Sequence, residues 1–195
     1  MPEIKPEWIE KLASRNPEER ADAATEICRA GRQRADLTVR AWWENADFAR
    51  LCGPGSSVTV GLAVQPITFA KIREANGWPH LANVPPEHDA SEFELHFAGG
   101  ISLDILTTRD AGGSGAIARF LAKFGEGVQQ VEFRCDDVDR AAAILREKFA
   151  VQPLYPAKRP GADGTNVNFF LVPAPDQTKV LIELYEASAP TATQP

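Results

Sequence analysis

The sequence predicts an α+β fold in which two βαβββ modules form one curled mixed sheet around a cup, preceded by an α-helical extension. Residues 1–53 carry helix signals, and past Gly55 the pattern changes to short alternating strands. The order of strand, helix and further strands then occurs twice, over 56–108 and 127–188. An internal repeat constrains the fold more than any single element does. We therefore expect a helical extension over 1–55, one domain built from the two modules over 56–188 and a disordered tail over 189–195.

Composition and charge narrow the classes of function. The chain has 195 residues, 44% apolar and 25% charged, which is typical of a globular protein that can bury a sizeable core. Its 21 basic and 27 acidic residues leave a formal charge of -6, which repels nucleic acid and anionic membranes, so we expect neither as a partner. Three cysteines without metal-type spacing, and an N-terminus without a signal pattern, indicate a reducing, cytoplasmic setting.

The N-terminal third has helix signals and no recognisable chemistry. Asn16 can cap a helix, and Gly31 either breaks this helix or only weakens it. A second helical segment, 36–51, carries Trp42 and Trp43. Such a pair either lines a ligand site or an interface or, more commonly, belongs to the core that holds an extension onto the main domain.

The first module begins with a strand over 57–64, in which aliphatic residues alternate with small or polar ones. A short helix follows over 67–76, and then a loop-rich stretch, 77–90, that the pattern leaves unassigned. Two strands, 92–97 and 101–107, close the module, with a glycine-rich hairpin turn between them.

The second module repeats this order after a connecting helix over 117–124. It has a strand over 127–135, a helix over 137–149 with an acidic cap, and a stretch rich in proline and glycine. The strands 166–172 and 179–186 complete it.

Strand alternation sorts the side chains of both modules onto two faces. One face is apolar, includes Val167 and Phe169, and should be covered by the helices. The opposite face would line the cup, and it collects Thr59, Glu94, His96, Asp104, Gln130, Glu132, Arg134, Asn168, Glu183 and Tyr185. A merely solvated face would also be polar. A site is favoured because Asp104 and Glu183 fall at equivalent positions of the two modules.

This arrangement resembles the vicinal oxygen chelate superfamily, which includes glyoxalases and bleomycin-resistance proteins, and within it the methylmalonyl-CoA epimerases. The resemblance rests on Ser114–Asp139, Gly164–Phe170 and Val180–Leu184, with a further match at Val84–Glu87. It covers about residues 57–187 and leaves the N-terminal helices outside.

The resemblance implies a divalent metal held at four equivalent positions, two in each module. Here these positions are Thr59, Asp104, Gln130 and Glu183. The epimerases have histidine at the first-strand positions, whereas this chain has Thr59 and Gln130. Two carboxylates and an amide suit hard ions such as Mg²⁺, Ca²⁺ or Mn²⁺ better than Zn²⁺, and Co²⁺ or Ni²⁺ are further candidates.

The resemblance also implies roles for carboxylates beside the metal. Superfamily enzymes stabilise an enolate or oxyanion, while a carboxylate moves a proton on or off carbon. Glu94 lies in the strand where the epimerase resemblance places a general base, and Glu183 would share the catalytic work; each is otherwise a surface glutamate. Glu132 and Arg134 either pair with each other or hold an anionic substrate. His96, Asn168 and Tyr185 complete the expected substrate-binding set.

Three functions remain open at this point. The first is a metal-dependent isomerase or lyase that transfers a proton next to a carbonyl of a small anionic substrate. The second is a metal-free protein that binds and sequesters a small molecule in the cup, which the loss of both histidines favours. The third is a role in assembly, with Trp42 and Trp43 at an interface. Pairing of chains is common for this fold, so the resemblance also implies a homodimer.

Overall fold

The structure, a computed structural model, describes residues 4–53, 58–173 and 179–187. The predicted tail over 189–195 lies outside the described residues, as does the expected start of the first strand at Ser57. The helices are α1 (Pro6–Leu12), α2 (Pro17–Glu44), α3 (Ala46–Cys52), α4 (Pro66–Ala75), α5 (Ala116–Phe124) and α6 (Val138–Phe149), with the short 3-10 turns η1 (Pro86–His88) and η2 (Ala162–Gly164). The strands are β1 (Val58–Ala63), β2 (Ala90–Phe97), β3 (Ile101–Thr108), β4 (Gly127–Arg134), β5 (Arg159–Pro160), β6 (Asn166–Pro173) and β7 (Lys179–Glu186). None of the described helices is both long and apolar enough to cross a membrane.

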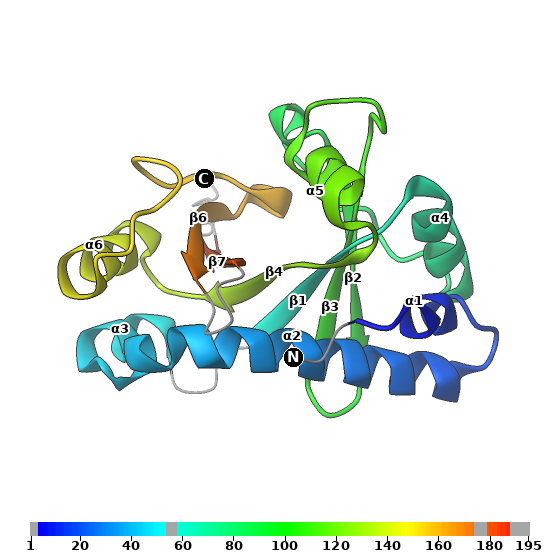
Figure 1. The fold of residues 1–195 in the computed structure, drawn as a ribbon, viewed down its shortest axis with the longest axis horizontal. Coiled ribbons are helices and arrows are strands. Elements are labelled where there is room, and N and C mark those ends of the chain that lie inside the picture. The colour runs from blue at the N-terminus through cyan, green and yellow to red at the C-terminus, as the bar shows by residue number, and fades with distance from the viewer. Residues whose placement is uncertain (1–3, 54–57, 174–178, 188–195) are drawn as a thin grey trace, which may run out of the picture.

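All seven strands belong to one mixed sheet in the order β2-β3-β1-β4-β7-β6-β5. The pairs β1–β3 and β4–β7 are parallel, and the remaining pairs are antiparallel. The central antiparallel pair β1–β4 joins the two modules, which rise on either side of it (Figure 1). The predicted α+β class and the curled mixed sheet are confirmed.

The two modules differ in the segment after their helix. In the second module β5, β6 and β7 follow α6, as expected. In the first module only β2 and β3 follow α4, because residues 77–89 form loops and η1 instead of a strand. The first module is therefore βαββ, and its loop becomes part of the roof over the concave face.

Helix α2 is continuous through Gly31, so of the two alternatives left open by the sequence, a break at Gly31 is excluded. Asn16 caps the helix by accepting a hydrogen bond from the backbone N–H of Glu18. A Cβ atom at residue 31 would lie 2.6 Å from Val60 Cγ1, so glycine is what lets α2 lie directly on β1. Contacts to β3, β1, β4 and β7 carry α2 across the outer face of both modules, along the base of the view in Figure 1.

The tryptophan pair belongs to the core. Trp42 is 3% exposed and packs edge-on against Phe48 and Phe170, and Trp43 packs against Phe133 of β4. These contacts confirm that the pair holds the extension onto the second module. The interface role expected for Trp42 in an assembly protein is wrong, because its side chain is buried.

Candidate active site

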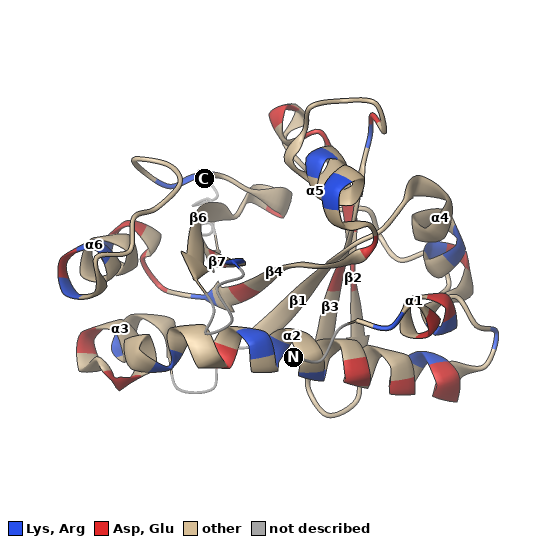
Figure 2. Ribbon diagram, viewed as in Figure 1, with Lys and Arg blue, Asp and Glu red and all other residues tan. Residues whose placement is uncertain are grey.

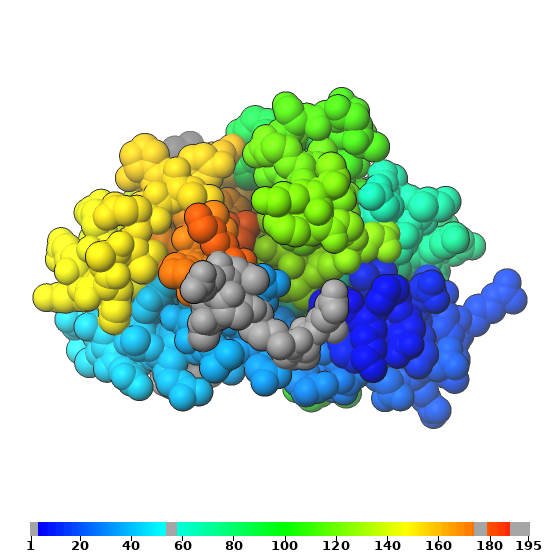
Figure 3. Space-filling model, viewed as in Figure 1, coloured from blue at the N-terminus to red at the C-terminus, as the bar shows by residue number. Residues whose placement is uncertain are grey.

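The concave face of the sheet encloses a cavity of about 600 Å³. Strands β2, β3, β4 and β7 form its floor, α5 forms one wall, and loops of both modules form its roof. In the space-filling view α5 in green and the yellow segment before β6 stand apart, with the orange strands of the second module between them (Figure 3). Acidic positions on the central strands and basic positions on α5 are shown in Figure 2.

The centre of the floor is a side-chain amide that joins two carboxyl groups. Gln130 Nε2 donates to Glu183 Oε2 over 2.6 Å and to Glu132 Oε1 over 3.1 Å. Glu132 and Glu183 are directly opposite each other in the parallel β4–β7 pair, so both side chains leave the sheet on the same face. The three side chains line the cavity together.

Glycine in the neighbouring strand makes room for this amide. Gly61 of β1 is opposite Gln130, and a Cβ atom there would lie 2.5 Å from Gln130 Cγ and 3.2 Å from Glu132 Oε1. Any larger residue would displace the amide from its position between the two carboxyl groups. The sequence of β1 therefore helps to build the floor without contributing a polar group.

Asp104 of β3 brings a further carboxyl group from the first module. Its side chain lines the cavity and is 6% exposed. Its Oδ1 atom is buried without a hydrogen-bond partner among the described residues. A buried acceptor without a donor costs free energy, so Asp104 favours a ligand that donates a hydrogen bond, or a proton of its own.

The floor carboxyl groups hold protons more tightly than usual. Burial raises the pKa of Glu132 to about 8, and the hydrogen bond from Gln130 opposes part of that rise. Burial, together with the surrounding carboxylates, raises the pKa of Asp104 and of Glu183 well above the ordinary range. Burial and the nearby charge of Asp163 raise the pKa of Glu92 to about 7. The floor can therefore donate protons near neutral pH, which a solvated glutamate cannot do.

Glu94 lies at the edge of this cavity. Its Oε2 is 2.9 Å from His96 Nε2, and both side chains are more than half exposed. His96 Nδ1 also lies 3.1 Å from the Ser102 hydroxyl. Glu94 lines the cavity whereas His96 does not, so the histidine orients the carboxylate from outside.

The roof contributes Arg159, a cation at the rim of the cavity. The guanidinium of Arg159 in β5 lies 4.6 Å from the centre of the Tyr155 ring and 4.0 Å from Glu87 Oε1. His88 is close enough that Arg159, after burial, lowers its pKa, and its Nε2 is buried without a partner among the described residues. These four side chains line the same cavity as the floor residues.

No protein-family model matches the chain, and no curated protein matches it. Solved structures do. The methylmalonyl-CoA epimerase from Mycobacterium tuberculosis is 27% identical with a TM-score of 0.55, over 70% of this chain and 93% of that chain. A Streptomyces coelicolor methylmalonyl-CoA epimerase variant, in complex with 2-nitronate-propionyl-CoA, is 26% identical with a TM-score of 0.54, over 69% of this chain and 98% of that one.

These matches span nearly the whole of each epimerase and include the paired modules. The chain is a divergent member of the vicinal oxygen chelate superfamily. A hypothetical protein from Bacillus halodurans C-125, at 22% identity and a TM-score of 0.54, has the same fold. The resemblance predicted from the sequence is thereby confirmed for the superfamily fold and for likeness to its epimerases.

The four superfamily metal positions are not assembled as a ligand set in this chain. Thr59 is buried in β1 and does not line the cavity. Gln130 uses its amide nitrogen to bind Glu132 and Glu183, which a cation between them would oppose. Within the described residues, no group of three His, Cys, Asp or Glu side chains is placed to hold a metal ion. The donors present therefore do not fit the ion that the superfamily resemblance implies.

Four residues predicted for the cup do not line the cavity: Thr59, His96, Arg134 and Asn168. Arg134 is exposed at the end of β4. Asn168 is 1% exposed and bonds the backbone of Tyr155, accepting from its N–H and donating to its carbonyl. These hydrogen bonds hold β6 so that the side chains predicted to face the helices face the cavity, and Asn168 faces away from it.

Consequently Val167 and Phe169 line the cavity, while Phe170 packs in the core. Six predicted residues do line it: Glu94, Asp104, Gln130, Glu132, Glu183 and Tyr185.

The roof and one floor residue were not predicted from the sequence. Glu87 and His88 lie in the 3-10 turn η1 and Arg159 in the two-residue strand β5, and such short elements show no periodicity from which the direction of a side chain could be predicted. The Val84–Glu87 match was the only signal for Glu87, and none pointed to His88. Glu92 could have been found, because it lies two residues before Glu94 on the same face of β2.

Proposed function

We propose that this chain is an isomerase or lyase that transfers a proton at the carbon next to a carbonyl group of a small anionic acyl substrate. The observation that carries the proposal is the Gln130 amide between Glu132 and Glu183 on the floor of a cavity. The epimerases with similar structures work on an acyl-CoA, which supports this reaction class.

The chemistry would use the chain's own groups. The substrate carbonyl oxygen would lie over the floor, where Glu132 keeps its proton near neutral pH and donates a hydrogen bond to the developing oxyanion. Glu183, which is held by Gln130 and whose pKa is raised well above the ordinary range, would return a proton to the adjacent carbon, and Glu94 at the cavity edge would take the proton from the opposite face. No step is assigned to a divalent ion, because the ligand set is not assembled.

The substrate class follows from the cavity and from the neighbours. One similar epimerase is in complex with methylmalonyl-CoA, so we propose an acyl thioester or a comparable small acyl anion for this chain. Epimerisation of methylmalonyl-CoA itself is not the expected activity, because Thr59 and Gln130 replace the histidines of the epimerases.

Exchange of the α-proton in D₂O tests the proposal directly. Propionyl-CoA, methylmalonyl-CoA, malonyl-CoA and pyruvate are incubated with the protein, and deuterium uptake is followed by proton NMR. Each reaction is run with EDTA and with added Mg²⁺, Mn²⁺, Ca²⁺, Co²⁺, Ni²⁺ or Zn²⁺. We expect catalysed exchange of at least one substrate that persists in EDTA, and a loss of about 100-fold or more in Glu183→Gln.

Glu147→Gln is the matched control for that variant, because Glu147 is exposed on α6 and outside the cavity. Its exchange rate should equal that of the unmodified protein. Absence of exchange for every substrate, with and without metal, would refute the proposed reaction.

The second candidate is a metal-free protein that sequesters a small molecule. The apolar side chains of Leu106, Ile117 and Phe169 in the cavity wall favour it, since they would bury an uncharged portion of a ligand. A thermal-shift screen in EDTA tests it. A compound that raises the melting temperature in proportion to its concentration, without being turned over, would establish binding in place of catalysis.

We also propose a cytoplasmic location and a homodimer. Cys28, Cys52 and Cys135 are all buried and free, which agrees with a reducing compartment. Light scattering of the purified protein measures its mass in solution. A mass equal to that of one chain at all concentrations would refute the proposed homodimer.

A further inference from the structure

The described floor residues of the cavity include no cation, whereas the rim has Arg159 beside the carboxylate of Glu87. Asp104, Glu132 and Glu183 on the floor can become negative but never positive. Arg159 on the rim is positive at every physiological pH. The other arginine in the lining, Arg119 of α5, is exposed and donates to the Ser114 carbonyl. Arg159 is therefore a half-buried positive group toward which an anionic ligand in the cavity would be drawn.

Arg159 has unused hydrogen-bonding capacity. Among the described residues its guanidinium makes no hydrogen bond; it lies over the Tyr155 ring and 4.0 Å from a Glu87 oxygen. The Glu87 side chain is 57% exposed, whereas that of Arg159 is 25% exposed. A long ion pair with an exposed partner is weak, so an incoming carboxylate can displace Glu87 at little cost.

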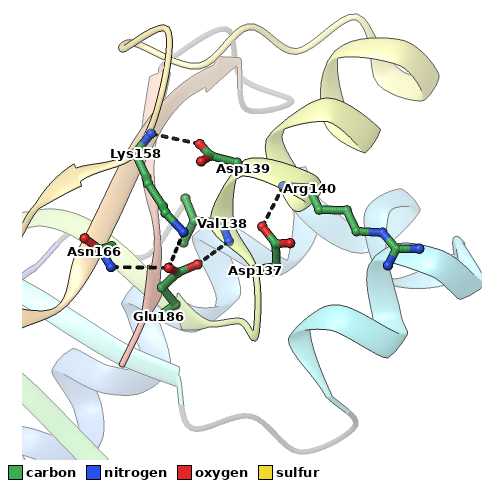
Figure 4. A network of polar contacts seen from close by, with 7 residues as sticks. All are labelled: Asp137, Val138, Asp139, Arg140, Lys158, Asn166 and Glu186. Atoms are coloured by element: carbon green, nitrogen blue, oxygen red, sulfur yellow. Dashed lines mark hydrogen bonds and ion pairs between the residues drawn. The ribbon is translucent and has the colours of Figure 1, made fainter. Parts of the chain in front are cut away.

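The residue before Arg159 is fixed from two directions, as Figure 4 shows. Lys158 Nζ lies 2.5 Å from Glu186 Oε1, and the Lys158 backbone N–H donates to Asp139 Oδ1 over 2.9 Å. Glu186 is itself held by the backbone N–H of Val138 at 2.7 Å and by Asn166 Nδ2 at 3.3 Å.

The strand that carries Arg159 is fixed as well, because Arg159 pairs with Val167 of β6. A guanidinium on such a support loses little freedom when it binds a ligand, which favours affinity.

We propose that Arg159, stacked on Tyr155, forms an anion-binding subsite at the rim of the cavity, and that it takes the carboxylate of an acyl substrate whose reacting carbon lies over Gln130. The planar guanidinium can bind both oxygens of a carboxylate, and the ring beneath it fixes its plane. The position of this subsite would then set the orientation of the substrate, with its anionic end at Arg159 and its carbonyl at the floor.

This inference rests on the proposed function only for the position of the reacting carbon. Binding of the carboxylate does not require turnover. Its test therefore uses two ligands that differ by one carboxylate, malonyl-CoA and acetyl-CoA, and measures their affinities by isothermal titration calorimetry in EDTA.

Four proteins are compared: the unmodified chain, Arg159→Met, Arg159→Lys and Arg140→Met. Arg140 is the matched control, because it is exposed and points away from the network in Figure 4. We expect the unmodified chain to bind malonyl-CoA more tightly than acetyl-CoA. Arg159→Met should lower the affinity for malonyl-CoA by about 10- to 100-fold, whereas the affinity for acetyl-CoA should change by less than about twofold. Arg159→Lys should recover part of the loss, and Arg140→Met should lose nothing. Equal melting temperatures across the four proteins exclude a general loss of fold.

Other outcomes would overturn the subsite. If Arg159→Met lowered the affinity for both ligands equally, Arg159 would be assigned to the phosphates of CoA. If the unmodified chain bound malonyl-CoA no more tightly than acetyl-CoA, there would be no carboxylate subsite. Failure of the proposed function is separate. A preference for malonyl-CoA that depends on Arg159, without proton exchange, would keep the subsite and remove the reaction.

Discussion

The two modules place carboxyl groups at equivalent positions but surround them differently. In the first module Asp104 lies next to Gly61, and its Oδ1 has no hydrogen-bond partner among the described residues. In the second module Glu183 lies beside Glu132 and accepts a hydrogen bond from Gln130. The first-strand positions diverge as well, because Thr59 is withdrawn from the cavity whereas Gln130 lies at its centre.

This difference shows that a repeated scaffold does not have to repeat its site. The first module supplies space through Gly61 and an unpaired acceptor through Asp104. The second supplies the connected polar group, which is what a proton transfer needs. A binding or catalytic asymmetry should therefore appear when equivalent positions are changed in turn.

The largest expected effect compares the two equivalent carboxyl groups. Glu183→Gln should lower α-proton exchange by about 100-fold or more, because it removes a group that transfers the proton. Asp104→Asn should lower it by only about 10-fold, because Asp104 Oδ1 has no hydrogen-bond partner among the described residues. Rates of deuterium uptake measure both, and equal losses would contradict the asymmetry.

The next effect concerns the space that Gly61 leaves. In Gly61→Ala the new Cβ would lie 2.5 Å from Gln130 Cγ, so the amide must move away from Glu132 and Glu183. We expect a loss of about 1–3 kcal/mol in the free energy of unfolding, measured by urea denaturation, together with reduced exchange. Gly127→Ala is the matched control, since a Cβ there meets nothing within 4 Å. A stable Gly61→Ala protein with full activity would show that Gln130 does not need its position.

A smaller effect is expected in the pH dependence of stability. The pKa of Glu132 is raised to about 8 in the folded chain, so the folded state binds more protons than the unfolded state between the ordinary glutamate range and pH 8. The free energy of unfolding should therefore fall as the pH rises through that interval, by at most about 1.4 kcal/mol per pH unit for this group. Denaturation of Glu132→Gln over the same range should give a shallower slope. An unchanged slope would mean that Glu132 titrates normally.

The smallest effect is expected at the position equivalent to Gln130. Thr59→Ser keeps the hydroxyl of a residue that does not line the cavity, so exchange should stay within about twofold. Steady-state rates with the best substrate measure this. A large loss of exchange activity in Thr59→Ser would show that Thr59 contributes to the site.

The sequence predicted the fold and half of the site for identifiable physical reasons. Alternation in β4 and β7 places Gln130, Glu132 and Glu183 on one face, and the structure confirms that placement. In β6 the adjacent Phe169 and Phe170 fit either face equally well. The hydrogen bonds between Asn168 and the backbone of Tyr155 decide which side chains of β6 point into the cavity. Tyr155 lies outside the strand, so alternation within β6 could not predict these bonds.

Strand periodicity could not predict the rim. Arg159 belongs to a two-residue strand in a stretch rich in proline and glycine, and Glu87 lies in a 3-10 turn. Neither segment is long enough to show a pattern. Their meeting depends on how the roof loops fold over the sheet, which includes the bond from the Asn83 backbone N–H to Asp163 Oδ1 between the two modules.

The continuity of α2 has a mechanical consequence for how a ligand enters. A single helix of 28 residues packs against β3, β1, β4 and β7, so it connects the two modules along its length. A hinge motion between β1 and β4 would have to bend this helix, and we therefore expect the two modules to unfold as one cooperative unit. Entry to the cavity then depends on local opening of the roof loops, whose amide protons should exchange with solvent well before those of the central strands.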